Sequence, residues 1–223
     1  SVVDSDASAS DVVARLINPA TGLPSGQELV VSLGSGFAFN GDPTVAANGS
    51  LALVCWSASK PGACTGGLCH NLLCRFLSTE ALAVIGSAFT VGPTSAYAPG
   101  NPVVSAGVDG SWAVAWDANP DVDAAGLSVQ VQRVTSDGLI AAPRWVANRT
   151  VLGDQKRPAL ALLPGGALFV GWQADAQDAS GWHRRQADPQ VDRHDLGRVL
   201  RDGERLLDAD VGRAHATEIE QRD

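Results

Sequence analysis

Methionine is absent from this sequence of 223 residues, and aromatic residues make up only 5% of it. Because no start codon is represented, we expect a fragment of a longer or processed protein. No apolar run approaches the roughly 18 to 20 residues that a membrane-spanning helix needs. Residues 1–11 also lack the basic-then-apolar order of a signal peptide. These absences predict a soluble chain with no membrane span.

Positive charge is scarce as well: 16 Lys and Arg stand against 24 Asp and Glu, which leaves a net charge of −8. Such a chain repels phosphate backbones, so nucleic acid is not an expected partner. What the sequence does contain is 45% hydrophobic residues, together with 24 glycines and 12 prolines. This composition favours a substantial core built from many short strands. We therefore predict an all-β fold.

An internal repeat organises most of the chain. The segments 43–56, 102–116 and 158–172 each open with proline, turn at glycine and end in tryptophan. Each segment predicts a β-hairpin. The turn glycines are Gly49, Gly110 and Gly166, and the closing tryptophans are Trp56, Trp116 and Trp172.

An arginine-bearing strand marks each unit as well, with Arg15, Arg75 and Arg133 in matching surroundings. Each unit then contains about four strand-like runs, which in the third copy are 127–134, 144–147, 158–163 and 167–173. Four strands per unit are typical of a propeller blade. We predict tandem four-stranded antiparallel repeats, β-propeller-like and incomplete, over residues 1–181, with approximate units 11–69, 70–126 and 127–181. The alternative is a β-sandwich, which has no reason to repeat the same landmarks.

Side-chain alternation indicates how these sheets pack. On the run 51–56, Ala52, Val54 and Trp56 share one face, and Leu51, Leu53 and Cys55 share the other. Both faces are mostly apolar, as expected of a sheet stacked between neighbours. Trp56, Trp116 and Trp172 are therefore expected to pack between sheets rather than to stack on sugars. Trp112 and Trp145 are not shared by all copies and are the better candidates for exposure.

The composition changes at residue 182. Residues 183–223 hold half of all Lys and Arg and lack the proline-to-tryptophan hairpin. The run 196–207 has weak helical spacing, interrupted by Gly203. We expect 182–223 to be a charged tail that is poorly ordered or partly helical.

The third copy resembles tandem repeats of large secreted bacterial surface proteins. The residues that carry the resemblance are Gln132 and Arg133 on one strand, Asn148, Thr150, Gly153, Gln155 and Pro158 in a link, and Gly166, Val170 and Trp172 in a hairpin. The resemblance implies an extracellular, β-propeller-like repetitive scaffold and brings no catalytic residues. It covers about residues 11–181.

Four cysteines, Cys55, Cys64, Cys69 and Cys74, lie within one connection between two predicted strands. If these strands are antiparallel neighbours, Cys55 and Cys74 face each other, and Cys64 and Cys69 close the tip. The sequence alone leaves all three connectivities open, but each implies an oxidising compartment. A zinc site with His70 is the sharper alternative, although paired C-x-x-C spacing is missing.

The loops after the tryptophans are acidic, and Asp117, Asp121 and Asp123 are weak candidates for calcium binding. A solvated hairpin tip is the simpler explanation, so we expect no cofactor. Asp175 and Asp178 lie in the matching loop of the third copy, and Asp4 and Asp6 in the leading one. A nucleophilic serine elbow is missing, and no spacing identifies a pair of catalytic carboxylates.

Three functions fit this sequence. We expect a non-enzymatic module, extracellular or on the cell surface, that presents loops to an unidentified protein or glycan. The alternative is a propeller-type glycan hydrolase whose carboxylates converge from several blades, some of them outside this chain. It requires at least three acidic or arginine side chains from different blades in a central funnel. The third reading is a structural spacer with no ligand.

Overall fold

The computed structural model describes residues 10–62, 68–95, 99–119, 126–149, 153–175, 198–201 and 204–207. Every regular element in these ranges is a β-strand, which confirms the predicted all-β class. No helix in the described residues is long and apolar enough to cross a membrane.

The strands form a leading hairpin and three four-stranded antiparallel sheets. The leading hairpin pairs β1 (Val13–Ile17) with β2 (Pro24–Val30). Sheet I contains β3 (Phe39–Asn48), β4 (Leu51–Pro61), β5 (Leu68–Ser78) and β6 (Ala83–Ser95). Sheet II contains β7 (Gly100–Ala106), β8 (Trp112–Ala118), β9 (Ser128–Val134) and β10 (Trp145–Val146). Sheet III contains β11 (Gln155–Leu162), β12 (Leu168–Ala174), β13 (Arg198–Arg201) and β14 (Glu204–Leu207).

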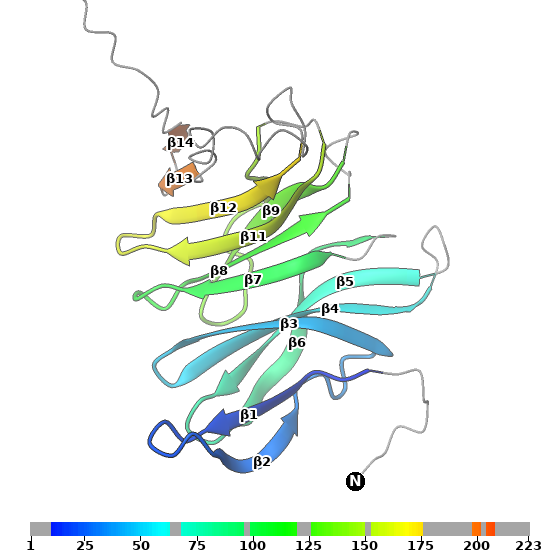
Figure 1. Ribbon diagram of the computed structural model, residues 1–223, viewed down its shortest axis with the longest axis vertical. Helices are drawn as coiled ribbons and strands as arrows, with labels where there is room; N and C mark the ends of the chain where they lie inside the picture. The colour runs from blue at the N-terminus through cyan, green and yellow to red at the C-terminus, as the bar shows by residue number, and fades with distance from the viewer. Residues whose placement is uncertain are drawn as a thin grey trace, which may run out of the picture.

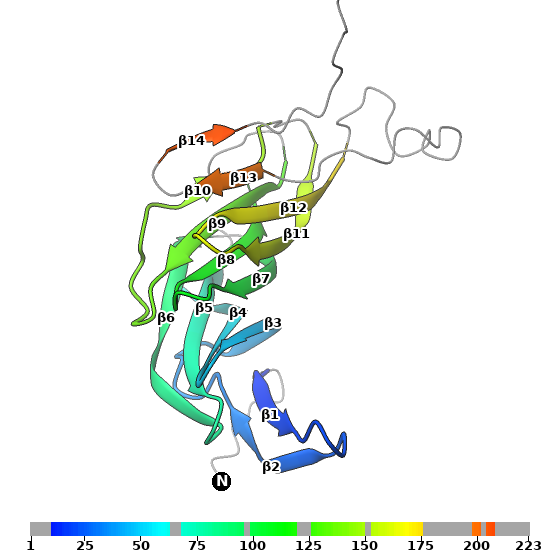
Figure 2. The same ribbon diagram turned by 90° about the vertical axis from the view of Figure 1, so that its left-hand side faces the viewer.

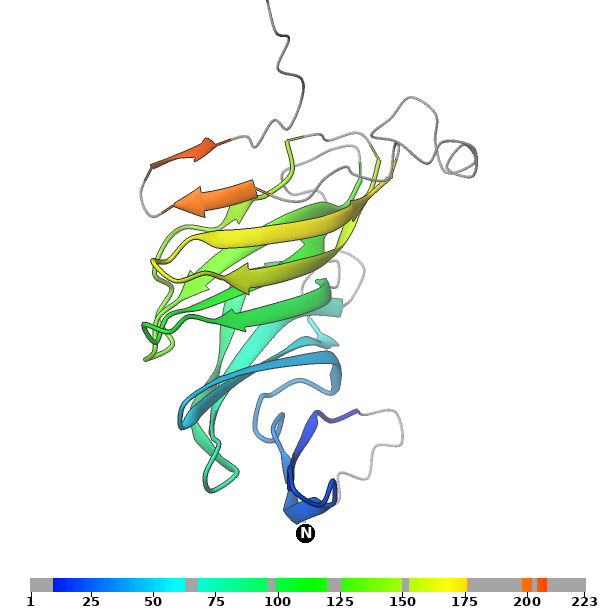
Figure 3. The ribbon, with the colours of Figure 1, turned by 60° about the vertical axis from the view of Figure 1, so that its left-hand side comes forward.

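The three sheets fan out from their first strands. β3, β7 and β11 lie side by side, and each sheet then runs outward in chain order (Figure 1 and Figure 3). The Asn48 side chain donates a hydrogen bond of 2.6 Å to the Gly107 carbonyl, and the Leu162 N–H donates one of 2.9 Å to the Ser105 hydroxyl. Figure 2 shows an open arc, with the leading hairpin at one end and sheet III at the other. This arrangement is the predicted incomplete propeller.

The sequence repeat and the sheets have the same period but a different phase. The unit 127–181 contains β9 and β10 of one sheet and then β11 and β12 of the next. The units 11–69 and 70–126 are split in the same way. Each repeat unit therefore contains the last two strands of one sheet, which form its outer half, and the first two strands of the next sheet, which form its inner half.

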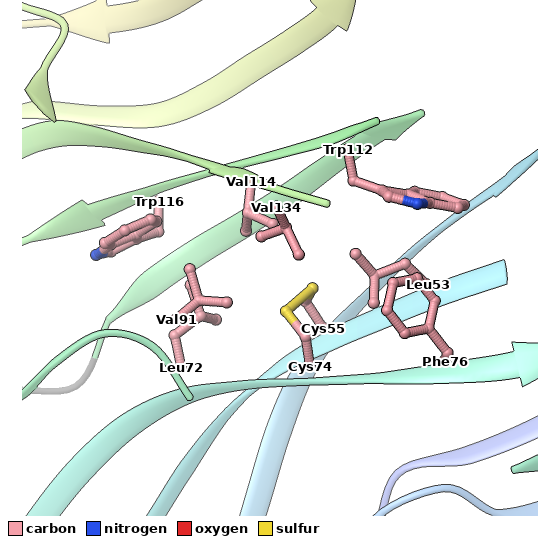
Figure 4. Close-up of a cluster of buried hydrophobic side chains, with 10 residues drawn as sticks. All are labelled: Leu53, Cys55, Leu72, Cys74, Phe76, Val91, Trp112, Val114, Trp116 and Val134. Atoms are coloured by element: carbon pink, nitrogen blue, oxygen red, sulfur yellow. A yellow bond between two sulfur atoms is a disulfide. The ribbon is translucent and has the colours of Figure 1, made fainter. Parts of the chain in front are cut away.

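Three apolar clusters fill the spaces between successive sheets. Trp56 lies in the cluster between the leading hairpin and sheet I, together with Ala52 and Val54. Leu53 and Cys55 point the other way and pack against sheet II (Figure 4). This alternation is the one predicted from the strand period. Trp116 and Trp172 also face the sheet that precedes their own.

The expectation that Trp112 is exposed is wrong. Trp112 is only 1% exposed, and it packs edge-on against Phe76 with their ring centroids 5.7 Å apart. Trp112 precedes Trp116 by four residues, so the period of two places both on the same buried face of β8. Trp145 is half-buried. Lack of repetition was therefore a poor guide to exposure.

Part of the tail is extended. β13 pairs with β12, and β14 pairs with β13, over the run where weak helical spacing stood in the sequence. Gly203 disfavours a helix there, and the free edge of β12 offers backbone hydrogen bonds to a strand. The remainder of 182–223 lies outside the described residues.

Candidate functional site: a strained bulge at the inner edge of each sheet

A β-bulge interrupts the first strand of every sheet at the same point. In sheet I, Gly41 pairs with Ser57 and Thr44 pairs with Cys55, so two residues oppose Trp56 alone. The corresponding pairs of sheet II leave Asn101 and Pro102 opposite Trp116. In sheet III, the residues opposite Trp172 are Arg157 and Pro158. The repeated proline and tryptophan are thus the two sides of one bulge.

The residue before each of these prolines has a left-handed backbone. Asp42 has a φ of 50°, Asn101 a φ of 44° and Arg157 a φ of 54°. Such a conformation costs a non-glycine residue about 1 to 3 kcal/mol and persists only where its surroundings impose it. A following proline adds to the constraint, because it favours extended backbone. Bulges of this kind re-aim side chains and are common beside active sites.

These three residues form one polar row, which we call the inner-edge row. Asp42, Asn101 and Arg157 are all exposed and stand at equivalent positions on the neighbouring strands β3, β7 and β11. Within the described residues, the Asp42 carboxylate and the Arg157 guanidinium have no hydrogen bond or ion pair. Their backbones are therefore strained while their charges remain available to a ligand.

Asp117 connects the row from one sheet to the next. Its carboxylate, only 3% exposed, accepts 2.8 Å from the Asn101 amide and 2.9 Å from the backbone N–H of Arg157. Gly100 makes this possible, since a Cβ there would lie 2.1 Å from the Asp117 carboxylate. Ser57, the matching residue of sheet I, donates to the Pro99 carbonyl of sheet II. The residue after each of these two tryptophans thus bonds the next sheet, Ser57 just before β7 and Asp117 at the bulge of β11.

Buried amides hold the start of the inner strands. The Asn40 side chain accepts 2.9 Å from the Trp56 indole N–H and donates 2.8 Å to the Ser10 carbonyl. In sheet III, Gln155 accepts 3.0 Å from the Asn148 amide, and Asn148 in turn accepts 2.9 Å from the Val129 N–H. The Asn and Gln of the sequence link are therefore hydrogen-bonded anchors beside the bulge.

The structure gives Asp117 a role that differs from the calcium site considered for it. Its carboxylate is satisfied by protein donors, and no cluster of three candidate metal ligands occurs in the described residues. Asp121, Asp123 and Asp178 lie outside those residues, as do Asp4 and Asp6. Asp175 binds the Lys156 ammonium at 2.8 Å, and this hydrogen bond is the main cause that raises the pKa of Lys156.

The predicted Cys55–Cys74 disulfide is present. The two residues are directly paired on β4 and β5, with their Cα atoms 4.0 Å apart, and both are fully buried beside sheet II (Figure 4). Cys69 is disulfide-bonded as well. Cys64 lies outside the described residues, so its pairing with Cys69 stays a prediction.

The three repeat arginines do not line a common funnel. Arg75 is buried and donates 2.7 Å to the Val31 carbonyl of the preceding hairpin. Arg133 pairs with Ala113 and donates to the Gly166 carbonyl of the following sheet. Arg15 donates 3.0 Å to Gly26 within the leading hairpin. They lie on different faces because Arg75 pairs with Val54, two residues before its tryptophan, and Arg133 with Ala113, three before.

The sequence pattern did not identify the inner-edge row as a site, although its three residues occupy the same position in each repeat. The residues that precede the three repeated prolines are polar in each copy, as Asp42, Asn101 and Arg157. Only their shared position opposite the tryptophan marks them as one site. Together they offer a carboxylate, an amide and a guanidinium, which suit the hydroxyl groups of a polar ligand.

No protein-family model matches the chain, and no curated protein matches it. The resemblance to secreted repeat proteins therefore stays a prediction. Among solved structures, the chain is similar to a candidate glycoside hydrolase from Parabacteroides distasonis, with 10% identity, a TM-score of 0.37, and coverage of 60% of this chain and 47% of that one. A glycosyl hydrolase from Bacteroides ovatus gives 13% identity and a TM-score of 0.35, over 60% of this chain and 43% of that one.

A third similar structure comes from work on the GH130 family of mannoside phosphorylases, which contains glycoside hydrolases that target β-1,2 mannosidic linkages in Candida mannan. It gives 10% identity and a TM-score of 0.37, over 75% of this chain and 48% of that one. The chain thus spans less than half the length of each of these proteins. At these scores the likeness does not assign an activity.

The comparisons nevertheless correct one expectation. The solved structures similar to this chain are described as carbohydrate-processing enzymes, whereas we expected a non-enzymatic scaffold and no enzyme. That reading is contradicted and is not retained. The repeat alone was a weak reason to expect a non-enzymatic scaffold, because a fold built from repeated sheets can also hold an active site.

Proposed function

We propose that the chain supplies part of a glycan-processing site at the inner edge of a β-propeller. The observation that carries the proposal is the inner-edge row: three polar residues from three sheets hold the same strained conformation, and two of them carry unpaired charges. Strain that recurs at an exposed polar position is better explained by a ligand than by packing.

Asp42 is the acidic group of this site. Glycoside hydrolysis usually needs two carboxylates, one as an acid and one as a base or nucleophile. Asp117 is bound to protein donors and is not available for this task. The second carboxylate then belongs to residues outside the row described here. Asn101 and Arg157 would bind and orient sugar hydroxyl groups.

The protein is also proposed to act outside the cytoplasm. A fully buried disulfide in the core of sheet I supports this location, because such bonds persist in oxidising compartments. Free-thiol labelling of protein isolated from its native source would test it. Four unreactive cysteines are expected, whereas labelling of Cys55 and Cys74 would contradict the location.

The decisive experiment measures binding and cleavage of neutral oligosaccharides, including one with β-1,2-mannosidic linkages. Asp42→Asn removes a charge at the row and should weaken binding by about tenfold or more, the usual effect of losing a charged hydrogen bond. Glu80→Gln is the matched control, since Glu80 is exposed in a turn away from the row. Equal binding by the two variants, or no binding by the unaltered chain, would refute the proposal.

A further inference from the structure

The inner-edge row changes its charge from one sheet to the next. Asp42 places a carboxylate on β3, Asn101 an amide on β7 and Arg157 a guanidinium on β11, in the order in which these strands lie side by side (Figure 3). One end of the row therefore accepts hydrogen bonds and carries negative charge, and the other end donates them and carries positive charge. A ligand that binds the whole row must have the opposite polarity.

A single buried oxygen atom holds the middle and the positive end of the row. Oδ2 of Asp117 accepts a hydrogen bond of 2.8 Å from the Asn101 amide and one of 2.9 Å from the Arg157 backbone N–H. The Asn101 nitrogen thus faces Asp117, and its side-chain oxygen has no hydrogen-bond partner in the described residues. The backbone that carries the Arg157 side chain is fixed by the same carboxylate. Binding a ligand to these two groups therefore requires little further ordering of the backbone.

Arg157 is a cation without a partner among the residues that the structure describes. Its neighbour Lys156 is bonded to Asp175 at 2.8 Å and lies 3.7 Å from Asp154, so the chain itself balances the charge of Lys156. The Asp117 carboxylate is bonded as well. The Arg157 side chain, by contrast, is exposed and makes no hydrogen bond or ion pair within the described ranges. A guanidinium stays charged, and its planar fork matches the two oxygens of a carboxylate.

The spacing of the row sets the size and the direction of the ligand. Strands that lie side by side are at least about 4.7 Å apart, so the two steps from β3 to β11 span about 9 Å or more. A ligand that reaches both ends is therefore longer than one sugar ring. An anionic group is repelled by the Asp42 end and attracted by the Arg157 end. The acidic part of such a ligand then lies at Arg157, and its neutral hydroxyl groups lie at Asp42.

We propose that the inner-edge row selects acidic glycans. Arg157 binds the carboxylate of a uronic acid unit, and Asp42 and Asn101 accept hydrogen bonds from the hydroxyl groups of the neighbouring neutral units. The inference rests on the proposed glycan-processing site and names the class of substrate that this site takes.

The first test compares one ligand with and without its charge. Isothermal titration calorimetry would measure a trisaccharide of two mannose units and one terminal glucuronic acid unit, as the free acid and as its methyl ester. The free acid should bind about tenfold or more tightly, the usual effect of a charged hydrogen bond. This preference should shrink at high salt, because ions screen an exposed pair. Equal binding of the two forms would overturn the acidic preference alone, whereas binding of neither form would overturn the glycan site with it.

The second test assigns the preference to Arg157. Arg157→Gln should abolish the preference for the free acid and leave the binding of the methyl ester nearly unchanged. Asp42→Asn should weaken the binding of both forms and leave the preference in place. Arg15→Gln is the matched control, since it removes the same charge from the leading hairpin at the other end of the arc (Figure 2). A preference that survives Arg157→Gln, or that Arg15→Gln also removes, would contradict the proposal.

A third variant separates binding from folding. Glycine adopts the φ of 54° at position 157 without strain, so Arg157→Gly should unfold at the same temperature as the unaltered chain or at a higher one. The same variant should lose the preference for the free acid. If it lost thermal stability and kept the preference, Arg157 would support the fold and not the ligand.

Discussion

The two junctions between sheets have the same architecture but different contents. Between sheets I and II the cluster holds Trp112, Trp116, Phe76 and the Cys55–Cys74 disulfide (Figure 4). Between sheets II and III the fully buried residues are alanine, valine and one leucine, with Trp145 and Trp172 only half-buried beside them. The buried amides of Asn148 and Gln155 flank this cluster.

The difference follows from a single strand. β8 presents its large side chains, Trp112, Val114 and Trp116, to sheet I, and its small ones, Ala113 and Ala115, to sheet III. The first junction therefore depends on filled volume and the second on close approach and satisfied hydrogen bonds. Three changes test this comparison and a fourth tests an ion pair within sheet III, from the largest expected effect to the smallest.

Trp112→Ala should lower the free energy of unfolding by about 3 to 5 kcal/mol, because it removes a large, fully buried side chain from the first junction. Urea denaturation measures the loss. Trp145→Ala is the control, since Trp145 is half-buried at the outer edge of the second junction and should cost clearly less. Equal costs would show that the first junction does not depend on volume.

Replacing Cys55 and Cys74 together with alanine should cost about 3 kcal/mol, because a disulfide closing a loop of 19 residues limits the unfolded chain. Hydrogen exchange should then speed up for amides of β4 and β5. Amides of β11 and β12, at the second junction, should keep their protection. Uniform loss of protection would contradict the separation of the junctions.

Asn148→Ala should cost about 1 to 3 kcal/mol, because it removes the buried hydrogen bonds of the Asn148 side chain to the Gln155 side chain and to the Val129 N–H. Thermal unfolding would measure it. Asn18→Ala removes an exposed turn hydrogen bond to Ala20 and serves as the control, with a smaller cost expected. If the two variants have the same stability, hydrogen bonding does not support the second junction.

The smallest effect concerns Lys156, whose pKa is raised above 10.5 mainly by its hydrogen bond to Asp175. The charged form is favoured by folding, so its contribution is fully present below pH 10.5 and is lost as the pH rises through the folded-state pKa. Lys156→Met should remove this alkaline loss of stability, which we expect to be under about 1 kcal/mol. Thermal unfolding at neutral and alkaline pH compares the two proteins, and an unchanged alkaline loss would contradict the assignment.

Much of the fold could be predicted from the sequence, because the two-residue alternation of side chains in a strand can be recognised within a few neighbouring residues. The hairpins around Gly49, Gly110 and Gly166 and the two faces of β4 follow from alternation and turn chemistry. The pairing of Cys55 with Cys74 was one of three connectivities, and the register of β4 on β5 selects it. The candidate site could not be found in this way. Its residues are separated by more than fifty positions each, and nothing local says that Asp42 and Arg157 share an edge.

The sequence by itself determined that this protein is all-β, that its unit has four strands, and that a tryptophan lies on the second strand of each sheet. These properties depend on neighbours within a hairpin. Only the tertiary structure decided that Trp112 is buried, that the repeat spans two sheets, and that Asp117 bonds the bulge of the next sheet. Each of these depends on which sheets stack together, because a side chain's surroundings between sheets come from residues distant in the chain.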